Sequence, residues 1–241
     1  EEGARERAPE DVTRVDDDAL DARALRFLGD AFARRGASTF WIEHDYYAPE
    51  TGFFSYVHDV PSRRENKMDA VVDMVKDVAS RAFPGVKRAR YAEWWAHSRP
   101  HTDGHQLHFD SHDEGLGEVR HPICSAVVFV DGCCGGPTLV TDQTFGSAAS
   151  RCWAAAPRAN RLLAFDGRAL HGVLPGAGAA PGRRVTFMVN FWACDPTGGK
   201  QKYATRLQYS SIRTVLHTFF IVHKGLIERK RSVQKSAETT S

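Results

Sequence analysis

Short apolar runs that alternate with polar residues fill the middle of the chain, between about residues 86 and 196. The runs are rich in Val, Phe, Trp and Thr, and Gly, Pro, Asp and Asn separate them at intervals of about ten residues, a pattern typical of antiparallel β sandwiches and barrels. No βαβ alternation favours a parallel sheet. The strands that we expect are Thr39–His44, Arg90–Ala96, Gln106–Asp110, Ser125–Val130, Thr138–Thr141, Arg161–Phe165, Gly172–Leu174 and Arg184–Trp192.

Three further segments carry apolar residues at helical spacing. The predicted helices span about residues 17–35, 66–83 and 210–231. Asn66 with Asp69 resembles a capping arrangement at the start of the second helix, and Pro84 ends it. The pattern therefore predicts an α+β protein, mainly β, in which helices flank one antiparallel β core. The expected domain organisation is a single domain over residues 16–231, with disordered polar segments at 1–15 and 232–241.

The composition is that of a soluble globular protein. The chain has 241 residues, of which 42% are hydrophobic and 26% charged, so it can form one sizeable core. No run of roughly 18 apolar residues is present, so we expect no membrane span. Five cysteines are too few, and too odd a number, for a disulfide framework. Because the first residue is Glu1, the compartment stays open between the cytoplasm and an organelle reached through an upstream targeting segment that is missing here.

Charge is unevenly distributed along the chain. The net charge is only +2, yet residues 200–235 hold nine Lys or Arg residues and a single acid, Glu228. The basic residues could form a solvated face of the third predicted helix, or they could bind an acidic partner such as nucleic acid. The sequence leaves both interpretations open.

Histidines cluster between residues 97 and 121, and two of them begin a His-x-Asp sequence. Around His108 and Asp110, apolar and polar residues alternate, so a strand would turn both side chains to one face, about 7 Å apart. The other pair, His101 and Asp103, lies in a stretch with turn composition, where side chains are held less rigidly. We therefore expect His108 and Asp110 to be two ligands of one metal ion.

A third ligand is expected from a distant strand, and His171 fits this role. It follows a buried-strand pattern and a turn at Asp166-Gly167. Two His and one carboxylate, with open positions opposite, form the ligand set of non-haem Fe(II) oxygenases. Further along, alternation places Arg184 and Thr186 on one face of a strand, where a guanidinium and a hydroxyl can clamp a carboxylate. Arg183 is the rival for this clamp, but alternation puts it on the opposite face from Thr186.

At this point the sequence resembles the Fe(II)/2-oxoglutarate-dependent dioxygenases, in particular their prolyl 4-hydroxylase-like branch. The resemblance covers residues 90–195 and is carried by His108-Phe109-Asp110, Gly135-Gly136-Pro137-Thr138-Leu139, Phe165 through Gly172, and Arg184-Val185-Thr186. It implies a double-stranded β-helix, or jelly-roll, core over about residues 86–196, with flanking helices. It also implies Fe(2+) held by His108, Asp110 and His171, with 2-oxoglutarate as cosubstrate on Arg184 and Thr186. Ascorbate is a further cofactor that the resemblance allows.

The chain departs from this branch where a tyrosine often precedes the His-x-Asp for cosubstrate binding. His101, Gly104 and His105 occupy the corresponding stretch, so the partner of the near carboxylate of 2-oxoglutarate is unassigned. Ser125 and Gln106 are weak candidates for it, and ordinary strand polarity explains each equally well. Aromatic residues are numerous enough to wall a dry site, and we expect Trp94 and Trp192 to line the substrate.

The implied reaction uses O2 and 2-oxoglutarate to hydroxylate an unidentified small molecule or protein side chain, with release of succinate and CO2. Two alternatives remain. The basic C-terminal segment motivates a nucleic-acid N-dealkylating oxygenase. The same ligands could also hold Zn²⁺ or Ni²⁺ in a non-catalytic, cupin-like metal-binding protein, although a metal store has no need of the clamp formed by Arg184 and Thr186.

Overall fold

The computed structural model describes residues 12–33, 39–60, 66–112, 119–132 and 134–196. The predicted helix at 210–231, the basic segment and the predicted C-terminal tail lie outside these residues. No helix in the described part of the chain is long and apolar enough to cross a membrane.

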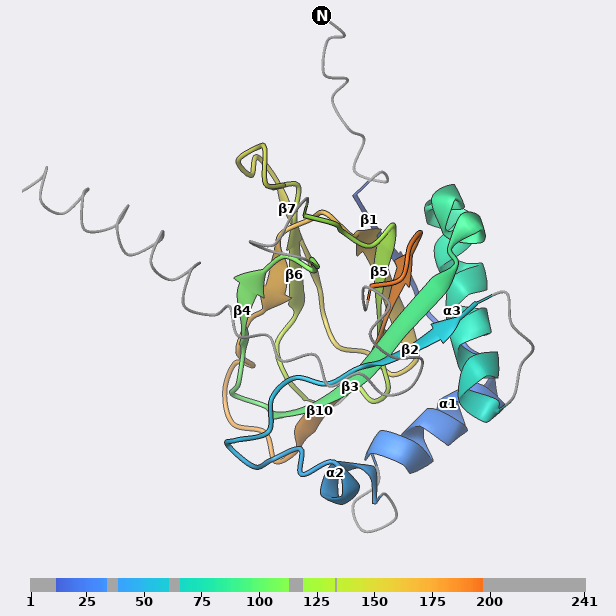
Figure 1. Ribbon diagram of the computed structural model, residues 1–241. Coiled ribbons are helices and arrows are strands. Elements are labelled where there is room, and N and C mark those ends of the chain that lie inside the picture. The colour runs from blue at the N-terminus through green and yellow to red at the C-terminus, as the bar shows by residue number, and fades with distance from the viewer. Residues whose placement is uncertain (1–11, 34–38, 61–65, 113–118, 133, 197–241) are drawn as a thin grey trace, which may run out of the picture.

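The described strands form two antiparallel sheets that face one another (Figure 1). The six-stranded sheet has the order β1-β8-β5-β10-β3-β2, and the four-stranded sheet has the order β4-β9-β6-β7. The strands are β1 (Thr13–Asp16), β2 (Tyr56–Asp59), β3 (Tyr91–Pro100), β4 (His105–His108), β5 (Cys124–Phe129), β6 (Thr138–Thr141), β7 (Cys152–Ala155), β8 (Arg161–Asp166), β9 (His171–Val173) and β10 (Arg183–Trp192). The chain crosses repeatedly between the sheets from β3 to β10, as in a jelly roll. The predicted fold class is confirmed.

The central strands of the larger sheet, such as β10, are buried on both faces, because each face covers a different core. On β10, Val185, Phe187 and Val189 face a core shared with the helices. Met188 faces a second core between the two sheets, together with Trp95 of β3. The side chains that alternate with the helix-facing residues therefore point into the barrel, and these inner positions can carry chemistry.

Helices cover the outer face of the larger sheet. They are α1 (Ala22–Leu28), continued by the π-helical η2 (Gly29–Ala33), then α2 (Phe40–Glu43), α3 (Lys67–Ala82) and the 3₁₀ helix η3 (Pro84–Arg88). Figure 1 shows α1 and α3 on this side, with β4, β6 and β7 on the other side of the barrel. The predicted capping box of α3 is present, since Asn66 accepts from the backbone N–H of Asp69 and the Asp69 side chain accepts from that of Asn66.

Several local predictions near the N-terminus were wrong. Thr39–His44 contains α2 rather than a strand: the backbone N–H groups of Glu43 and His44 donate to the carbonyls of Thr39 and Phe40, four residues earlier in each case, as in a helix. The first helix begins after its N-cap Asp21 and not near residue 17. Within the segment expected to be disordered, β1 begins at Thr13 and pairs with β8, because Val12 is buried in the core between the sheets. The strands β2 and β7 were not predicted.

Candidate metal centre

The side chains of His108, Asp110 and His171 converge at one point between the sheets. Their ligand atoms all lie within 4.8 Å of one another. The Nε2 atoms of His108 and His171 are 3.6 and 3.7 Å from the same atom, Oδ1 of Asp110. These distances are too long for hydrogen bonds, so three potential donor atoms surround a shared point without bonding to one another.

Backbone contacts set the orientation of both imidazoles. The Nδ1 atom of His108 lies 2.9 Å from the carbonyl oxygen of Gln106, and that of His171 lies 3.0 Å from the carbonyl oxygen of Ala169. A carbonyl only accepts, so each Nδ1 carries the proton and each Nε2 presents a lone pair to the shared point. Burial lowers the pKa of His171 to about 4, which keeps this ring neutral near pH 7. Both rings therefore have the tautomer that a metal ligand requires.

The carboxylate of Asp110 is held through its other oxygen. Ser125 on β5 donates its hydroxyl to Oδ2 at 2.8 Å, and the side chain of Asn190 on β10 also hydrogen-bonds to Asp110. Burial by itself raises the pKa of Asp110, but His171, His108 and the two hydrogen bonds together lower it below its ordinary value. Asp110 is therefore ionised, with Oδ1 turned toward the two imidazoles.

The sequence placed His108 and Asp110 on one strand, but the local structure differs. The strand β4 ends at His108, and its pairing with β9 shifts between His105 and His108. This irregularity turns His105 and His108 to the same side of the strand, where their rings stack with centroids 4.7 Å apart. Gln106 is exposed and contributes its backbone carbonyl to His108. We therefore do not retain Gln106 as a candidate for cosubstrate binding.

A cationic group lies on the inner face of the larger sheet. Arg184 is 4% exposed, its Nη2 donates to Oγ1 of Thr138 at 2.6 Å, and its Nε has no hydrogen-bond partner among the described residues. Thr186 is fully buried, and its hydroxyl is also unpartnered. Buried polar atoms are normally hydrogen-bonded, so both atoms fit a site whose ligand is an anion.

Arg183 points away from this group. Its guanidinium donates to the hydroxyl and the carbonyl of Ser98 and lies over the ring of Tyr47, 4.8 Å from the centroid. The strand alternation that favoured Arg184 thus holds in the structure. Gly135 packs directly on Arg184: a Cβ at this position would lie 2.5 Å from Cδ of the arginine, and φ of Gly135 is +89°. Glycine here allows the turn before β6 to pack closely on the aliphatic part of the Arg184 side chain.

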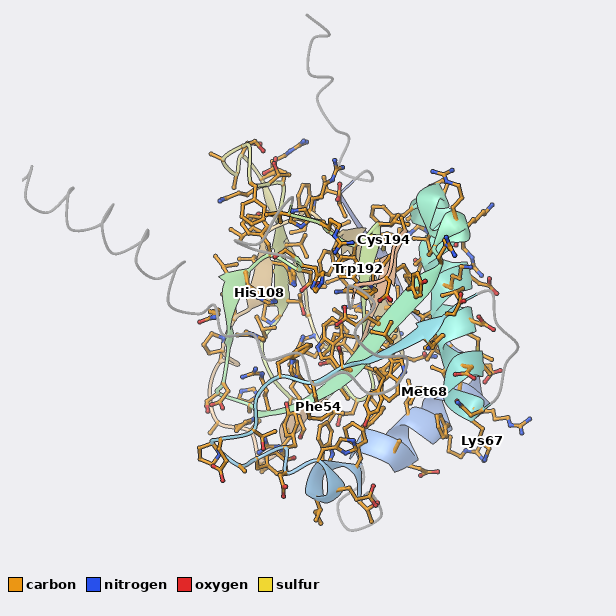
Figure 2. The ribbon with its side chains drawn as sticks, in the orientation of Figure 1. Phe54, Lys67, Met68, His108, Trp192 and Cys194 are labelled. Atoms are coloured by element: carbon orange, nitrogen blue, oxygen red, sulfur yellow. The ribbon has the colours of Figure 1, made fainter. Side chains whose placement is uncertain are left out.

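The other predicted site residues have different surroundings. Trp94 stacks on Tyr56 with centroids 4.3 Å apart and packs on the helix-covered core, so it lies on the wrong face of the sheet to line a site at the triad. Trp192 faces the barrel interior, where its Nε1 donates to Glu93 at 3.0 Å. Figure 2 shows His108 and Trp192 on opposing sheets. Ser125 bonds to Asp110 and not to a free position, so we no longer assign it to the cosubstrate.

Residues that the sequence analysis missed also lie on inner faces. Asn190 holds Asp110, and Glu93 is a buried carboxyl whose pKa burial raises to about 7, against hydrogen bonds from Ser55 and Trp192. On β3, His97 and Arg99 lie beside the cationic group. Strict two-residue alternation along β3 and β10 was the signal that could have found them.

Comparisons with known proteins give distant structural likenesses. Neither a family model nor a curated protein matches the chain. It is similar to a Pseudomonas putida prolyl-4-hydroxylase, with 16% identity, a TM-score of 0.49 and coverage of 76% of this chain and 93% of that one. It is also similar to AviO1 from Streptomyces viridochromogenes Tue57, with 13% identity, a TM-score of 0.48 and coverage of 77% and 92%. A third likeness is to the viral collagen prolyl hydroxylase of Paramecium Bursaria Chlorella virus-1 in its 2OG complex, with 13% identity, a TM-score of 0.43 and coverage of 74% and 94%.

Topology and geometry together define the class of protein: a jelly roll whose interior holds a two-His, one-carboxylate group. The donor set fits a divalent transition metal, since the ligand atoms of two imidazoles and one carboxylate lie close together. The unpartnered Nε of Arg184 and hydroxyl of Thr186 fit an anionic ligand in the same barrel.

Proposed function

We propose that this chain is an Fe(II)- and 2-oxoglutarate-dependent oxygenase that hydroxylates a small molecule or a protein side chain, with release of succinate and CO2. The observation that carries the proposal is that the Nε2 atoms of His108 and His171 lie 3.6 and 3.7 Å from the same oxygen of Asp110, so that three metal-ligating atoms surround one position. The inward guanidinium of Arg184 supports it further, because a site that only stores metal needs no buried cation.

In this proposal His108, Asp110 and His171 hold Fe(II), and Arg184 with Thr186 binds the distal carboxylate of 2-oxoglutarate. When bound, the iron and the keto acid would supply the oxidising chemistry, in which O2 gives one oxygen atom to succinate and one to the product. The protein binds, orients and excludes water. Trp95, Phe129 and Met188 line the inner core beside these residues and keep the interior dry.

The described residues also supply the proton control that such a site needs. Each ligand histidine keeps its proton on Nδ1 through a backbone carbonyl, so Nε2 stays free for the metal. The two imidazoles, together with the hydrogen bonds from Ser125 and Asn190, lower the pKa of Asp110 and so favour its carboxylate form. Metal ligands must be deprotonated at the atom that binds the ion, and the hydrogen bonds at Nδ1 leave both Nε2 atoms available for this role.

Anaerobic titration of the protein with Fe(II) and then 2-oxoglutarate tests the proposal. The expected result is a weak visible metal-to-ligand charge-transfer band that appears only when both are present and is lost in His108→Ala and His171→Ala. Succinate formation would then be measured with peptides, nucleosides and metabolites. Tight metal binding without the band would refute the oxygenase and favour the metal-binding alternative, and turnover with N-methylated nucleosides would identify the dealkylase.

A further inference from the structure

Two strands, and not only β10, contribute to the cationic group. On β3, Trp95 faces the core between the sheets, so His97 and Arg99 share its side of the strand. Arg99 is directly paired with Arg184, and His97 is directly paired with Thr186. These four residues therefore form a compact patch of two cross-strand pairs on the inner face of the sheet.

The patch has more positive charge than its surroundings balance. Burial, together with the charge of Arg99, lowers the pKa of Arg184 to about 10, while Asp131 acts in the opposite direction. Like charges directly opposite each other on paired strands destabilise a sheet. The Nε of Arg99, like that of Arg184, is buried without a hydrogen-bond partner in the described part of the chain. An anion between the two guanidiniums would offset the repulsion between Arg99 and Arg184 and would give their Nε atoms a hydrogen-bond acceptor.

His97 adds a neutral donor to this patch. The hydroxyl of Tyr46 accepts the backbone N–H of Ser98 at 3.2 Å and lies 2.9 Å from Nδ1 of His97. The tyrosine proton is satisfied when it points to Nδ1, and the imidazole then carries its own proton on Nε2. Burial and the nearby Arg99 hold the pKa of His97 well below its ordinary value, so the ring stays neutral. Tyr46 is thus a positioning residue for an N–H donor.

We propose that Arg99 and His97 of β3 bind the same distal carboxylate as Arg184 and Thr186, which makes the cosubstrate site a two-arginine clamp selective for dicarboxylates. The inference rests on the proposed function for the identity of the ligand, and it assigns a specificity role to β3. Arg99 supplies the second charge, and His97 supplies a donor whose direction Tyr46 sets.

Paired keto acids test the role of Arg99. The Fe(II)-loaded protein is titrated anaerobically with 2-oxoglutarate and with 2-oxobutanoate, which has the same keto acid end and no distal carboxylate. Arg99→Gln is expected to raise the Kd for 2-oxoglutarate about tenfold or more and to leave that for 2-oxobutanoate within about twofold. Arg90→Gln, at an exposed position just before β3, is the matched control and should change neither. An equal loss for both acids, or no loss for 2-oxoglutarate, overturns the assignment.

Three further variants test the donor role of His97. His97→Leu should weaken the binding of 2-oxoglutarate several-fold. His97→Gln should retain most of the original affinity, because its amide N–H can occupy a similar position. Tyr46→Phe should lower the affinity for 2-oxoglutarate less than His97→Leu does, and it should leave the affinity for 2-oxobutanoate unchanged. A loss in His97→Gln equal to that in His97→Leu contradicts the hydrogen-bonding role.

Succinate binding to the metal-free protein separates this inference from the oxygenase proposal. If no charge-transfer band forms with either keto acid but succinate binds and Arg99→Gln weakens it, the anion site is correct and the oxygenase assignment is wrong. If neither keto acid nor succinate binds, the anion site and the oxygenase assignment are both wrong. Isothermal titration calorimetry gives the affinity for succinate without any turnover.

Discussion

The hydrogen bond from Ser125 to Asp110 offers a direct test of how the barrel prepares its metal site. Ser125→Ala removes a donor that lies 2.8 Å from Oδ2 of the carboxylate and changes no atom that would touch the ion. Ser125 is only 2% exposed, so water cannot easily replace the lost hydroxyl. The variant leaves the hydrogen bond from Asn190 as the remaining one of the pair.

The size of the effect follows from the charge on the acceptor. A hydrogen bond to a charged group contributes roughly 1.5–3 kcal/mol, and loss of a partner that orients a ligand typically weakens metal binding by about 10–100-fold. The pKa of Asp110 should also rise toward its ordinary value, because one of the groups that lowers it is gone. Protons then compete better with the ion, so the loss of affinity should grow as the pH falls.

The assay is anaerobic competition for Fe(II) with a chromophoric chelator, repeated at several pH values. Ser80→Ala, a buried serine on α3 far from the triad in the fold, is the matched control and should bind Fe(II) like the unaltered protein. Equal Fe(II) affinity in Ser125→Ala and Ser80→Ala at every pH would refute the idea that Ser125 prepares Asp110 for the metal.

Three other changes should have measurable effects. Arg184→Gln should raise the Kd for 2-oxoglutarate by about two to four orders of magnitude, since loss of one partner of a buried charge pair costs about 3–5 kcal/mol. Arg183→Gln should leave this Kd nearly unchanged, and similar effects of the two variants in the anaerobic titration would contradict the assignment. Gly135→Ala should lower both the melting temperature and the affinity for 2-oxoglutarate, because the new Cβ would meet Arg184 at 2.5 Å; normal affinity would show that the turn does not position the guanidinium. Burial raises the pKa of Glu93 from 4.5 to about 7, so the folded state binds a proton that the unfolded state has released, and stability should fall as the pH rises through this interval. Glu93→Gln should remove that fall, and parallel stability curves of the two proteins from pH 4.5 to 7 would refute it.

The jelly roll was predictable because its strands are short and bounded by strong turn signals. The Asp166-Gly167 turn separates β8 from β9, and the glycines before Pro137 mark the entry to β6. The strands that were missed have weaker signals. β1 is recognisable only through its pairing with β8, a contact between residues about 150 positions apart that no local pattern contains.

The site was predictable where residue type alone restricts the chemistry. His-x-Asp, a later histidine and an inward arginine are rare enough in combination to single out His108, Asp110, His171 and Arg184. Gln106 could not be judged, because the irregular pairing of β4 changes which side chains share a face.

Trp94 and Trp95 show a different limit of sequence analysis. Adjacent tryptophans must face opposite sides of a strand, but the sequence does not say which side is the interior when both sides are covered. The helix-facing core contacts Trp94, and the core between the sheets contains Trp95.

A crystal structure of the protein grown anaerobically with Fe(II) and 2-oxoglutarate tests the central claim most directly, with the metal located by anomalous scattering at the iron edge. The account predicts one iron bound by Nε2 of His108, Nε2 of His171 and Oδ1 of Asp110, with the keto acid on its open side. An iron bound elsewhere, or these three side chains turned away from one another, would contradict it.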